Sequence, residues 1–176
     1  MNTQTICAPR PFPSSTILPR EELLKVLDQR RAQGEKLVFT NGVFDLIHPG
    51  HVRYLRDARI MGEMLVVALN TDDSVRRLKG PLRPILPFVE RAKIIASLEM
   101  VDYVTFFDEV TSLETIVLLH PDILVKGGDY TLDGIVGRNE VETMGGIVRS
   151  IPFVQGFAST LIIERIVQSA SVAPTR

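Results

Sequence analysis

The chain has 176 residues, of which 45% are hydrophobic and 23% charged, and its formal net charge is −1. This composition is sufficient for one buried core, and it excludes the global basic field that binding to DNA or RNA favours. Cys7 is the only cysteine, so no disulfide can form within the chain. No apolar run approaches the roughly 20 residues that span a bilayer, and residues 1–16 lack the pattern of a secretory signal. We therefore expect a soluble cytoplasmic protein that binds neither nucleic acid nor membrane.

Residues 1–19 contain four prolines, which resist helix and sheet alike, and they predict an irregular N-terminal arm ahead of a single domain over residues 20–176. In that domain, short apolar runs closed by turn residues alternate with amphipathic segments. The expected elements in chain order are a helix at 21–31, strand 36–42, helix 50–61, strand 63–70, helices 72–79 and 87–98, strand 101–107, helix 112–120, strand 122–129, helix 140–144, strand 146–153 and helix 159–169.

This alternation predicts an α/β fold, a Rossmann-like three-layer αβα domain with a mostly parallel sheet and right-handed crossovers. In such open sheets ligands bind beyond the carboxyl ends of the strands, where the strand order reverses. The residues that follow the expected strands are accordingly polar or rich in glycine, at 40–51, 70–73 and 126–130. The functional site is expected there.

The segment His48-Pro49-Gly50-His51 lies between the first strand and the next helix. Pro49 suits a first helical turn, and Gly50 lets a phosphate approach the backbone closely. The free N–H groups and the dipole of a helix start attract anions. Two imidazoles three residues apart could then donate hydrogen bonds to phosphate oxygens whose charge grows during a reaction. The alternatives are local hydrogen bonding at a helix start, or a zinc pair, which would lack its third and fourth ligands.

The segment TNGVFDLIHPGHVRYLRDAR, residues 40–59, resembles the signature of the HxGH nucleotidyltransferase, or cytidylyltransferase-like, superfamily. Four further segments occur in the order of that family: ALNTDDSVRRLKGPLRP, PFVERAKIIASLEMVDYV, PDILVKGGDYT and GFASTLIIERI. The resemblance covers residues 35–168 and is closest to the heptose-1-phosphate adenylyltransferase branch, the nucleotidyltransferase domain of ADP-heptose synthase. The absence of GxGxxG and Walker A patterns disfavours a dinucleotide oxidoreductase or a P-loop kinase.

The resemblance implies attack of a phosphorylated acceptor on the α-phosphate of a nucleoside triphosphate, with release of pyrophosphate. A phosphate monoester has a second pKa of about 6, so it is already a dianionic nucleophile at neutral pH and needs no general base. Catalysis should therefore consist mainly of alignment and positive charge. The residues expected to be catalytic are His48, His51, Lys79 and Arg91.

The same resemblance implies a nucleotide-binding set and an acceptor-binding set. Several candidate residues also have a structural alternative. These are a solvated helix end for Lys79, a surface ion pair for Arg91, a strand-end lysine for Lys126, a glycine turn at 127–129 and a helix cap for Ser159. The nucleotide set is Val43, Phe44, His48, His51, Lys126, Gly127, Gly128, Asp129, Ser159 and Thr160, and the acceptor set is Asp45, Asn70 and Arg83.

The resemblance favours transfer of AMP from ATP to D-glycero-β-D-manno-heptose 1-phosphate, for lipopolysaccharide core assembly, with Mg²⁺ accompanying ATP. It also implies a homodimer and, because 176 residues leave no room for a fused kinase, a separate heptose 7-phosphate kinase. One alternative is a cytidylyltransferase acting on glycerol 3-phosphate, but the arginine of that branch is replaced here by Phe153. The alternative of another class is a catalytically silent nucleotide sensor.

Overall fold

A computed structural model describes residues 16–128, 134–152, 156 and 158–171. Every helix and strand expected from the sequence is present, with ends shifted by up to two residues. The elements are α1 (Arg20–Arg31), β1 (Leu37–Gly42), α2 (Pro49–Arg59), β2 (Met64–Asn70), α3 (Asp72–Lys79), α4 (Phe88–Ala96), β3 (Tyr103–Phe107), α5 (Leu113–Leu119), β4 (Ile123–Gly127), α6 (Arg138–Thr143), β5 (Ile147–Ile151) and α7 (Ser159–Ser171).

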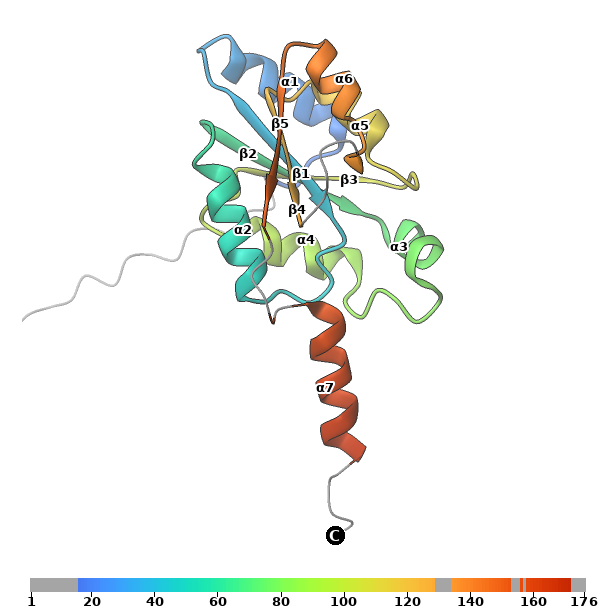
Figure 1. The fold of residues 1–176 in the computed structure, drawn as a ribbon. Coiled ribbons are helices and arrows are strands. Elements are labelled where there is room, and N and C mark those ends of the chain that lie inside the picture. The colour runs from blue at the N-terminus through green and yellow to red at the C-terminus, as the bar shows by residue number, and fades with distance from the viewer. Residues whose placement is uncertain (1–15, 129–133, 153–155, 157, 172–176) are drawn as a thin grey trace, which may run out of the picture.

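The five strands form one parallel sheet in the order β3-β2-β1-β4-β5. The chain moves outward from β1 through β2 to β3, and then returns across β1 to β4 (Figure 1). The strand order therefore reverses between β1 and β4, which is where the open-sheet rule places a ligand. The prediction of a Rossmann-like α/β fold is confirmed.

Helices cover both faces of the sheet, because successive side chains of each strand point to opposite sides. Along β2, Leu65 and Val67 face a cluster with α2 and α4, whereas Val66 and Ala68 face a second cluster with α1, α5 and α6. All seven residues of β2 are buried, so this strand occupies the interior of a three-layer structure. The packing explains why its sequence is a continuous apolar run rather than an alternating one.

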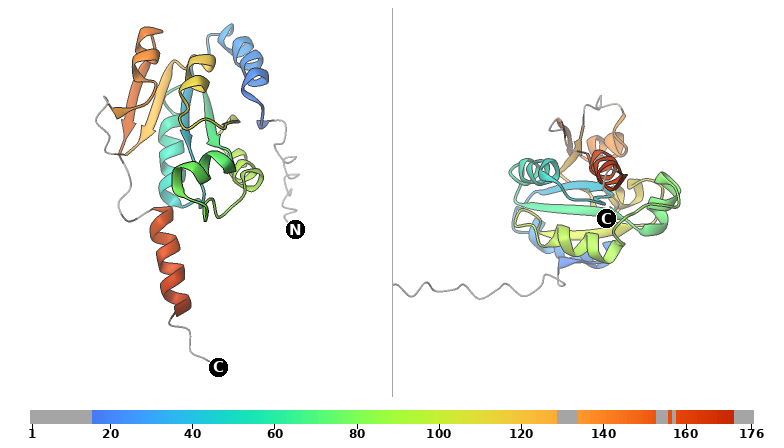
Figure 2. Two further views of the ribbon diagram at one scale, coloured as in Figure 1. Left: turned by 90° about the vertical axis from the view of Figure 1, so that its right-hand side faces the viewer. Right: turned by 90° about the horizontal axis from the view of Figure 1, so that it is seen from below.

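The two ends of the described chain differ in how they pack. Residues 16–19 of the expected N-terminal arm lie beside β3, where the N–H of Leu18 donates to the carbonyl of Val104 at 2.9 Å; residues 1–15 of that arm lie outside the described residues. Helix α7 begins beside the loop between β1 and α2 and extends away from the sheet (Figures 1 and 2). Its start is joined to that loop because the Ser159 hydroxyl donates to the Leu46 carbonyl at 3.0 Å.

Candidate active site

The sheet opens at the point where its strand order reverses. Strands β1 and β4 pair only at Val38–Ile123 and Phe39–Leu124, although both strands continue for three more residues. Beyond those pairs the two strands are joined by side chains. The hydroxyl of Tyr54 on α2 lies 2.6 Å from the Thr40 hydroxyl and donates to the Val125 carbonyl at 3.1 Å.

A pocket of about 550 Å³ lies over this opening. Polar and charged groups from the ends of β1 and β4, the start of α2 and the end of α3 line its centre. Apolar side chains from the segments after β3 and β4 form further walls. The principal lining residues are Asn41, Val43, Phe44, Asp45, His48, His51, Tyr54, Asn70, Leu78, Lys79, Arg83, Phe107, Val110, Thr111, Ser112, Lys126, Gly127, Ile135, Val136 and Ser159.

The two histidines of the HxGH segment both line the pocket. His48 is the N-cap of α2, and its Nδ1 accepts a long hydrogen bond of 3.4 Å from the N–H of His51. The two rings stack with their centroids 3.8 Å apart, and the ring of Phe44 packs 5.0 Å from that of His51. His48 therefore caps the helix, as the alternative of local hydrogen bonding expected. Capping still leaves both rings at the pocket, so it is compatible with phosphate binding.

Burial favours the neutral form of both imidazoles, and neighbouring cationic groups add to this at His51. Burial is the largest cause that lowers the pKa of His51 to about 4, with His48 and Lys79 adding to it. Burial also lowers the pKa of His48. The Nδ1 atom of His51 is buried and has no hydrogen-bond partner among the described residues. A polyphosphate would reverse this electrostatic balance, because an anion favours the protonated ring.

Two lysines approach the pocket from opposite sides. Lys79, the last residue of α3, has its pKa lowered by burial and by Arg83, which Asp45 partly offsets. Lys126 extends from β4, and burial lowers the pKa of its ammonium group. Its Nζ lies 3.1 Å from Oδ1 of Asn41, and both of its hydrogen bonds to that residue go to neutral oxygens. A buried ammonium group without a carboxylate partner is costly, and it indicates a site for an anion.

Asp45 is the one acidic residue among the described residues that line the pocket, and its carboxylate is already occupied. Its Oδ2 accepts from Nε of Arg83 at 2.6 Å, and its Oδ1 accepts from the N–H groups of Ile85 and Leu86 at 2.8 and 2.9 Å. Burial alone would raise the pKa of Asp45, but these hydrogen bonds outweigh it and hold the pKa below its usual range. Asp45 thus lies at the expected place with its acceptor positions filled by protein.

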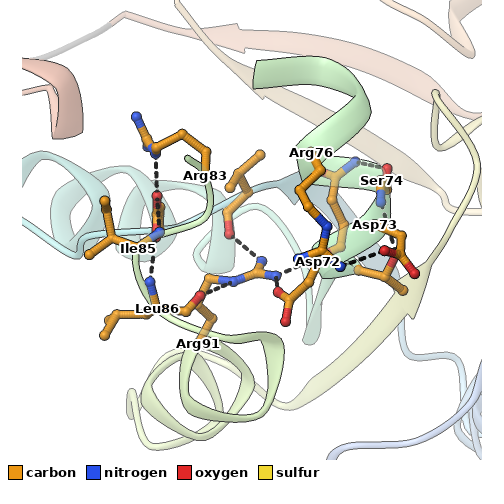
Figure 3. Close-up of polar contacts among 12 residues, drawn as sticks. Asp72, Asp73, Ser74, Arg76, Arg83, Ile85, Leu86 and Arg91 are labelled. Atoms are coloured by element: carbon orange, nitrogen blue, oxygen red, sulfur yellow. Dashed lines mark hydrogen bonds and ion pairs between the residues drawn. The ribbon is translucent and has the colours of Figure 1, made fainter. Parts of the chain in front are cut away.

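Arg91 is fully buried in α4 and is not among the residues that line the pocket. Its guanidinium donates to the carbonyls of Leu86, Val43 and Asn70 at 3.0, 2.8 and 3.0 Å, and to the Asp72 carboxylate at 2.6 Å (Figure 3). Arg91 therefore joins three segments that surround the pocket instead of reaching into it. The surface-ion-pair alternative is also wrong, because the guanidinium is not exposed.

The remaining candidates divide into lining and supporting residues. Val43, Phe44, Asn70, Gly127 and Ser159 line the pocket. Phe44 adopts a φ of 47°, and a Cβ at Gly42 would lie 2.9 Å from its ring, so glycine leaves room for this ring.

Gly128 and Thr160 do not line the pocket: the N–H of Gly128 donates to Ile151 in β5, and Thr160 is exposed. The expectations for Asp129 and Phe153 concern positions outside the described residues.

Several lining residues were not selected from the sequence. Asn41 and Tyr54 lie within the quoted HxGH segment, and Tyr54 follows His51 by three residues, the spacing of neighbours on one helix face. That spacing was a usable signal. Val110, Ile135 and Val136 come from loops whose apolar residues carry no local signature, and only the folded chain brings them to the pocket.

The described residues give no metal cage or membrane-spanning element. Across residues 16–128, 134–152 and 158–171, no group of three or more His, Cys, Asp or Glu side chains is arranged to hold a metal ion. None of the helices in the same part of the chain combines the length and the apolar character that crossing a bilayer requires.

Comparison with known proteins agrees with this geometry. The family model described as Cytidylyltransferase-like matches residues 39–165, which include the ends of β1, β2 and β4 and the start of α7. The chain belongs to the cytidylyltransferase-like family. It is therefore an enzyme of nucleotidyl transfer, and two imidazoles, two lysines and Arg83 line its pocket.

Curated proteins that carry the name Bifunctional protein HldE are similar to this chain. That of Trichlorobacter lovleyi is 52% identical over 154 residues, covering 88% of this chain and 31% of the relative. That of Syntrophotalea carbinolica is 55% identical over 152 residues, covering 86% and 31%. The chain thus spans about a third of the length of these relatives.

A solved structure provides a further comparison. The lipopolysaccharide core biosynthesis protein from Thermoplasma volcanium is 30% identical, with a TM-score of 0.57, and the match covers 69% of this chain and 98% of that protein. That protein is named for lipopolysaccharide core biosynthesis. The resemblance of residues 40–59 and of the later segments implied the same process.

Proposed function

We propose that this enzyme transfers AMP from ATP to D-glycero-β-D-manno-heptose 1-phosphate, giving ADP-heptose and pyrophosphate. The observation that supports phosphate chemistry most directly is the charge of the pocket: Lys79, Lys126 and Arg83 line it with the two histidines, and the one carboxylate among its described lining residues is already satisfied by Arg83 and two N–H groups. The relatives named HldE and the lipopolysaccharide core biosynthesis protein support the choice of heptose and ATP.

The proposed reaction needs no base from the protein. A phosphate oxygen of the sugar 1-phosphate attacks the α-phosphorus of ATP, forming a new P–O–P bond while the bond from that phosphorus to the β-phosphate oxygen breaks. The electron pair leaves with pyrophosphate. The sugar phosphate is already dianionic near pH 7, so the residues act by holding anions together and neutralising the leaving group.

The position of each residue suggests its part in this reaction. The first turn of α2, with His48 and His51, lies where N–H groups and a helix dipole favour the triphosphate. Lys79 reaches the same centre from α3, and Lys126 reaches it from β4. Arg91 acts as a positioning residue, because its contacts hold the segments that carry the lining residues.

The pocket extends to both sides of β1. We assign the β4 side, with Gly127 and the segment containing Ile135, to the nucleoside, because glycine backbone and apolar side chains suit a flat base. The side at β2 and β3 presents Asn70, Thr111 and Ser112, whose amide and hydroxyl groups suit the hydroxyls of a sugar. The acceptor would then approach the α-phosphate from the β2 side.

Nucleotidyl transfer from ATP generally uses a divalent metal, and we propose Mg²⁺. The one lining carboxylate, Asp45, has its oxygens occupied, so the described pocket fits an ion that is held mainly by phosphate oxygens and water. Its chemical contribution when bound would be to neutralise triphosphate charge. The separate heptose 7-phosphate kinase stays a prediction. The homodimer also stays a prediction. A second subunit could pack against the exposed side chains of Leu161 and Ile166 on α7.

The deciding experiment pairs ATP or CTP with heptose 1-phosphate or glycerol 3-phosphate and measures pyrophosphate release. We expect turnover with ATP and heptose 1-phosphate. CTP-dependent turnover of glycerol 3-phosphate without heptose activity would overturn the substrate assignment, and ATP binding without pyrophosphate release would indicate a sensor. His51→Ala should lower turnover by roughly 10²-fold if the ring stabilises developing charge, and near-normal turnover in the folded variant would remove that role.

A further inference from the structure

The loop between α3 and α4 carries Arg83 to the pocket, and one carboxylate of the β1–α2 loop determines where it lies. The loop begins after Lys79 and has little packing of its own, because Leu82 is 86% exposed and Ile85 is 50% exposed. The loop is held by the hydrogen bonds that Asp45 accepts from Arg83 and from the N–H groups of Ile85 and Leu86. Arg91 adds a hydrogen bond to the Leu86 carbonyl.

The two carboxylate oxygens of Asp45 accept different sets of hydrogen bonds. Oδ1 receives the main-chain N–H groups of Ile85 and Leu86 at 2.8 and 2.9 Å, and so fixes the backbone of the loop. Oδ2 receives Nε of Arg83 at 2.6 Å, which fixes the direction of the guanidinium, and it also receives the N–H of Ile85 at 3.0 Å (Figure 3). The Asp45 side chain is 1% exposed and that of Arg83 is 15% exposed, so water cannot easily replace this bond.

The far side of the Arg83 guanidinium is unsatisfied. Its Nη2 atom is buried and makes no hydrogen bond with the described residues, while the side chain lines the pocket. A buried N–H donor without an acceptor is destabilising, and an ionised guanidinium is suited to a phosphate oxygen. The side that faces Asp45 is anchored, and the remaining donors are available for a ligand.

We propose that Asp45 is a positioning residue that aims Arg83 at a phosphate group of one of the two substrates, and that Asp45 itself does not bind the sugar. This deepens the proposed function, on which its kinetic test rests. It replaces the expectation of direct contact between Asp45 and the acceptor, because the carboxylate that would accept hydroxyl hydrogens is saturated. Arg83, which the sequence placed in the acceptor set, then offers Nη2 as the donor to that phosphate.

A double-mutant cycle tests this division of roles. Asp45→Asn retains an Oδ1 for the two main-chain N–H groups but places an amide nitrogen or a weaker acceptor opposite Nε of Arg83. Arg83→Met removes the guanidinium. Each single variant should raise the KM of one substrate by roughly tenfold or more, the usual effect of losing a charge-assisted hydrogen bond, with a smaller change in kcat. The substrate whose KM rises identifies the phosphate.

The decisive quantity is the coupling. If Asp45 acts through Arg83, Asp45→Asn should change KM by less than about twofold in the Arg83→Met background. Additive effects would mean that Asp45 contacts the substrate independently, and they would overturn the proposal. Arg76→Met is the matched control, because Arg76 lies on α3 and makes an exposed pair with Asp73, and its KM values should equal those of the unaltered enzyme.

A second measurement separates this inference from the proposed function. Inorganic pyrophosphate binding, followed by calorimetry, requires no knowledge of the acceptor; Arg83→Met and Asp45→Asn should weaken it to a similar extent if the phosphate is that of the nucleotide. If neither variant alters pyrophosphate binding or the KM of either substrate, Arg83 is not a phosphate ligand. Hydrogen exchange at Ile85 and Leu86 should remain slow in Asp45→Asn and become fast in Asp45→Ala, since only alanine removes their acceptor.

Discussion

Replacement of Arg91 by methionine should destabilise the whole carboxyl end of the sheet. The guanidinium is 0% exposed, and its four hydrogen bonds reach the β1–α2 loop, the end of β2, the start of α3 and the α3–α4 loop. Methionine has a similar length and fills much of the same volume, but it offers no donor. Three main-chain carbonyl oxygens would lose a charged partner at the same time.

The size of the effect follows from these contacts. Removing one partner from a buried charged network costs about 3–5 kcal/mol. The Asp72 side chain is 27% exposed, so water can replace the arginine there, and most of the loss should come from the carbonyls of Val43, Asn70 and Leu86. For a domain of this size, a loss of 3–5 kcal/mol corresponds to a decrease in Tm of roughly 6–20 °C.

Thermal and urea unfolding would measure this change against a control on the same helix. Lys93 is exposed and pairs with Glu90 at 3.5 Å, so Lys93→Met should alter Tm by little. Arg91→Lys should give an intermediate result, because a single ammonium cannot reach all four acceptors. A Tm for Arg91→Met within about 2 °C of the unaltered protein would refute the positioning role of Arg91.

Three further predictions concern the charge of the pocket. Because the folded-state pKa of His51 lies near 4, below the ordinary 6.5, the unfolded chain binds the proton first, so stability should decrease as pH falls from 6.5 towards 4 and should decrease less in His51→Asn. ATP should raise the pKa of His51, so ATP binding should be accompanied by proton uptake near pH 6. Calorimetry in buffers of different ionisation enthalpy would measure this uptake, and equal heats in all buffers would contradict it. Lys126→Met should leave Tm unchanged or higher but lower kcat by roughly tenfold or more, since it removes a buried charge that, among the described residues, is hydrogen-bonded to Asn41 alone. Unaltered kcat would exclude a role for this ammonium.

The fold and the location of the site could be predicted because both depend on local patterns. Apolar runs such as residues 64–70 identify buried strands without knowledge of their partners, and parallel strands bring the polar residues at their ends together. The end of β4 was less predictable. The strand stops at Gly127, two residues early, because Gly128 takes a φ of 130° and its N–H turns to Ile151.

The partners of charged residues could not be predicted in the same way. Asp45 and Arg83 are 38 residues apart in sequence, and Arg91 and Val43 are 48 apart. Nothing local to an arginine indicates whether its donors will meet a substrate or the carbonyls of a distant loop. For this reason the sequence could place these residues near the same edge of the sheet but could not separate those that line the pocket from those, such as Arg91, that hold the surrounding segments together.

The link between α2 and the opened strands has a consequence for any titration of this enzyme. Burial raises the pKa of the Tyr54 phenol, although its hydrogen bond with Thr40 opposes this, so the group keeps its proton throughout the pH range in which enzymes are assayed. The hydrogen bonds through which Tyr54 joins α2, the helix that carries the two imidazoles at its start, to β1 and β4 are therefore insensitive to acid and base. Changes in rate with pH would report on the rings and on the phosphates they meet, and ultraviolet absorbance of this tyrosinate should emerge only when the chain unfolds.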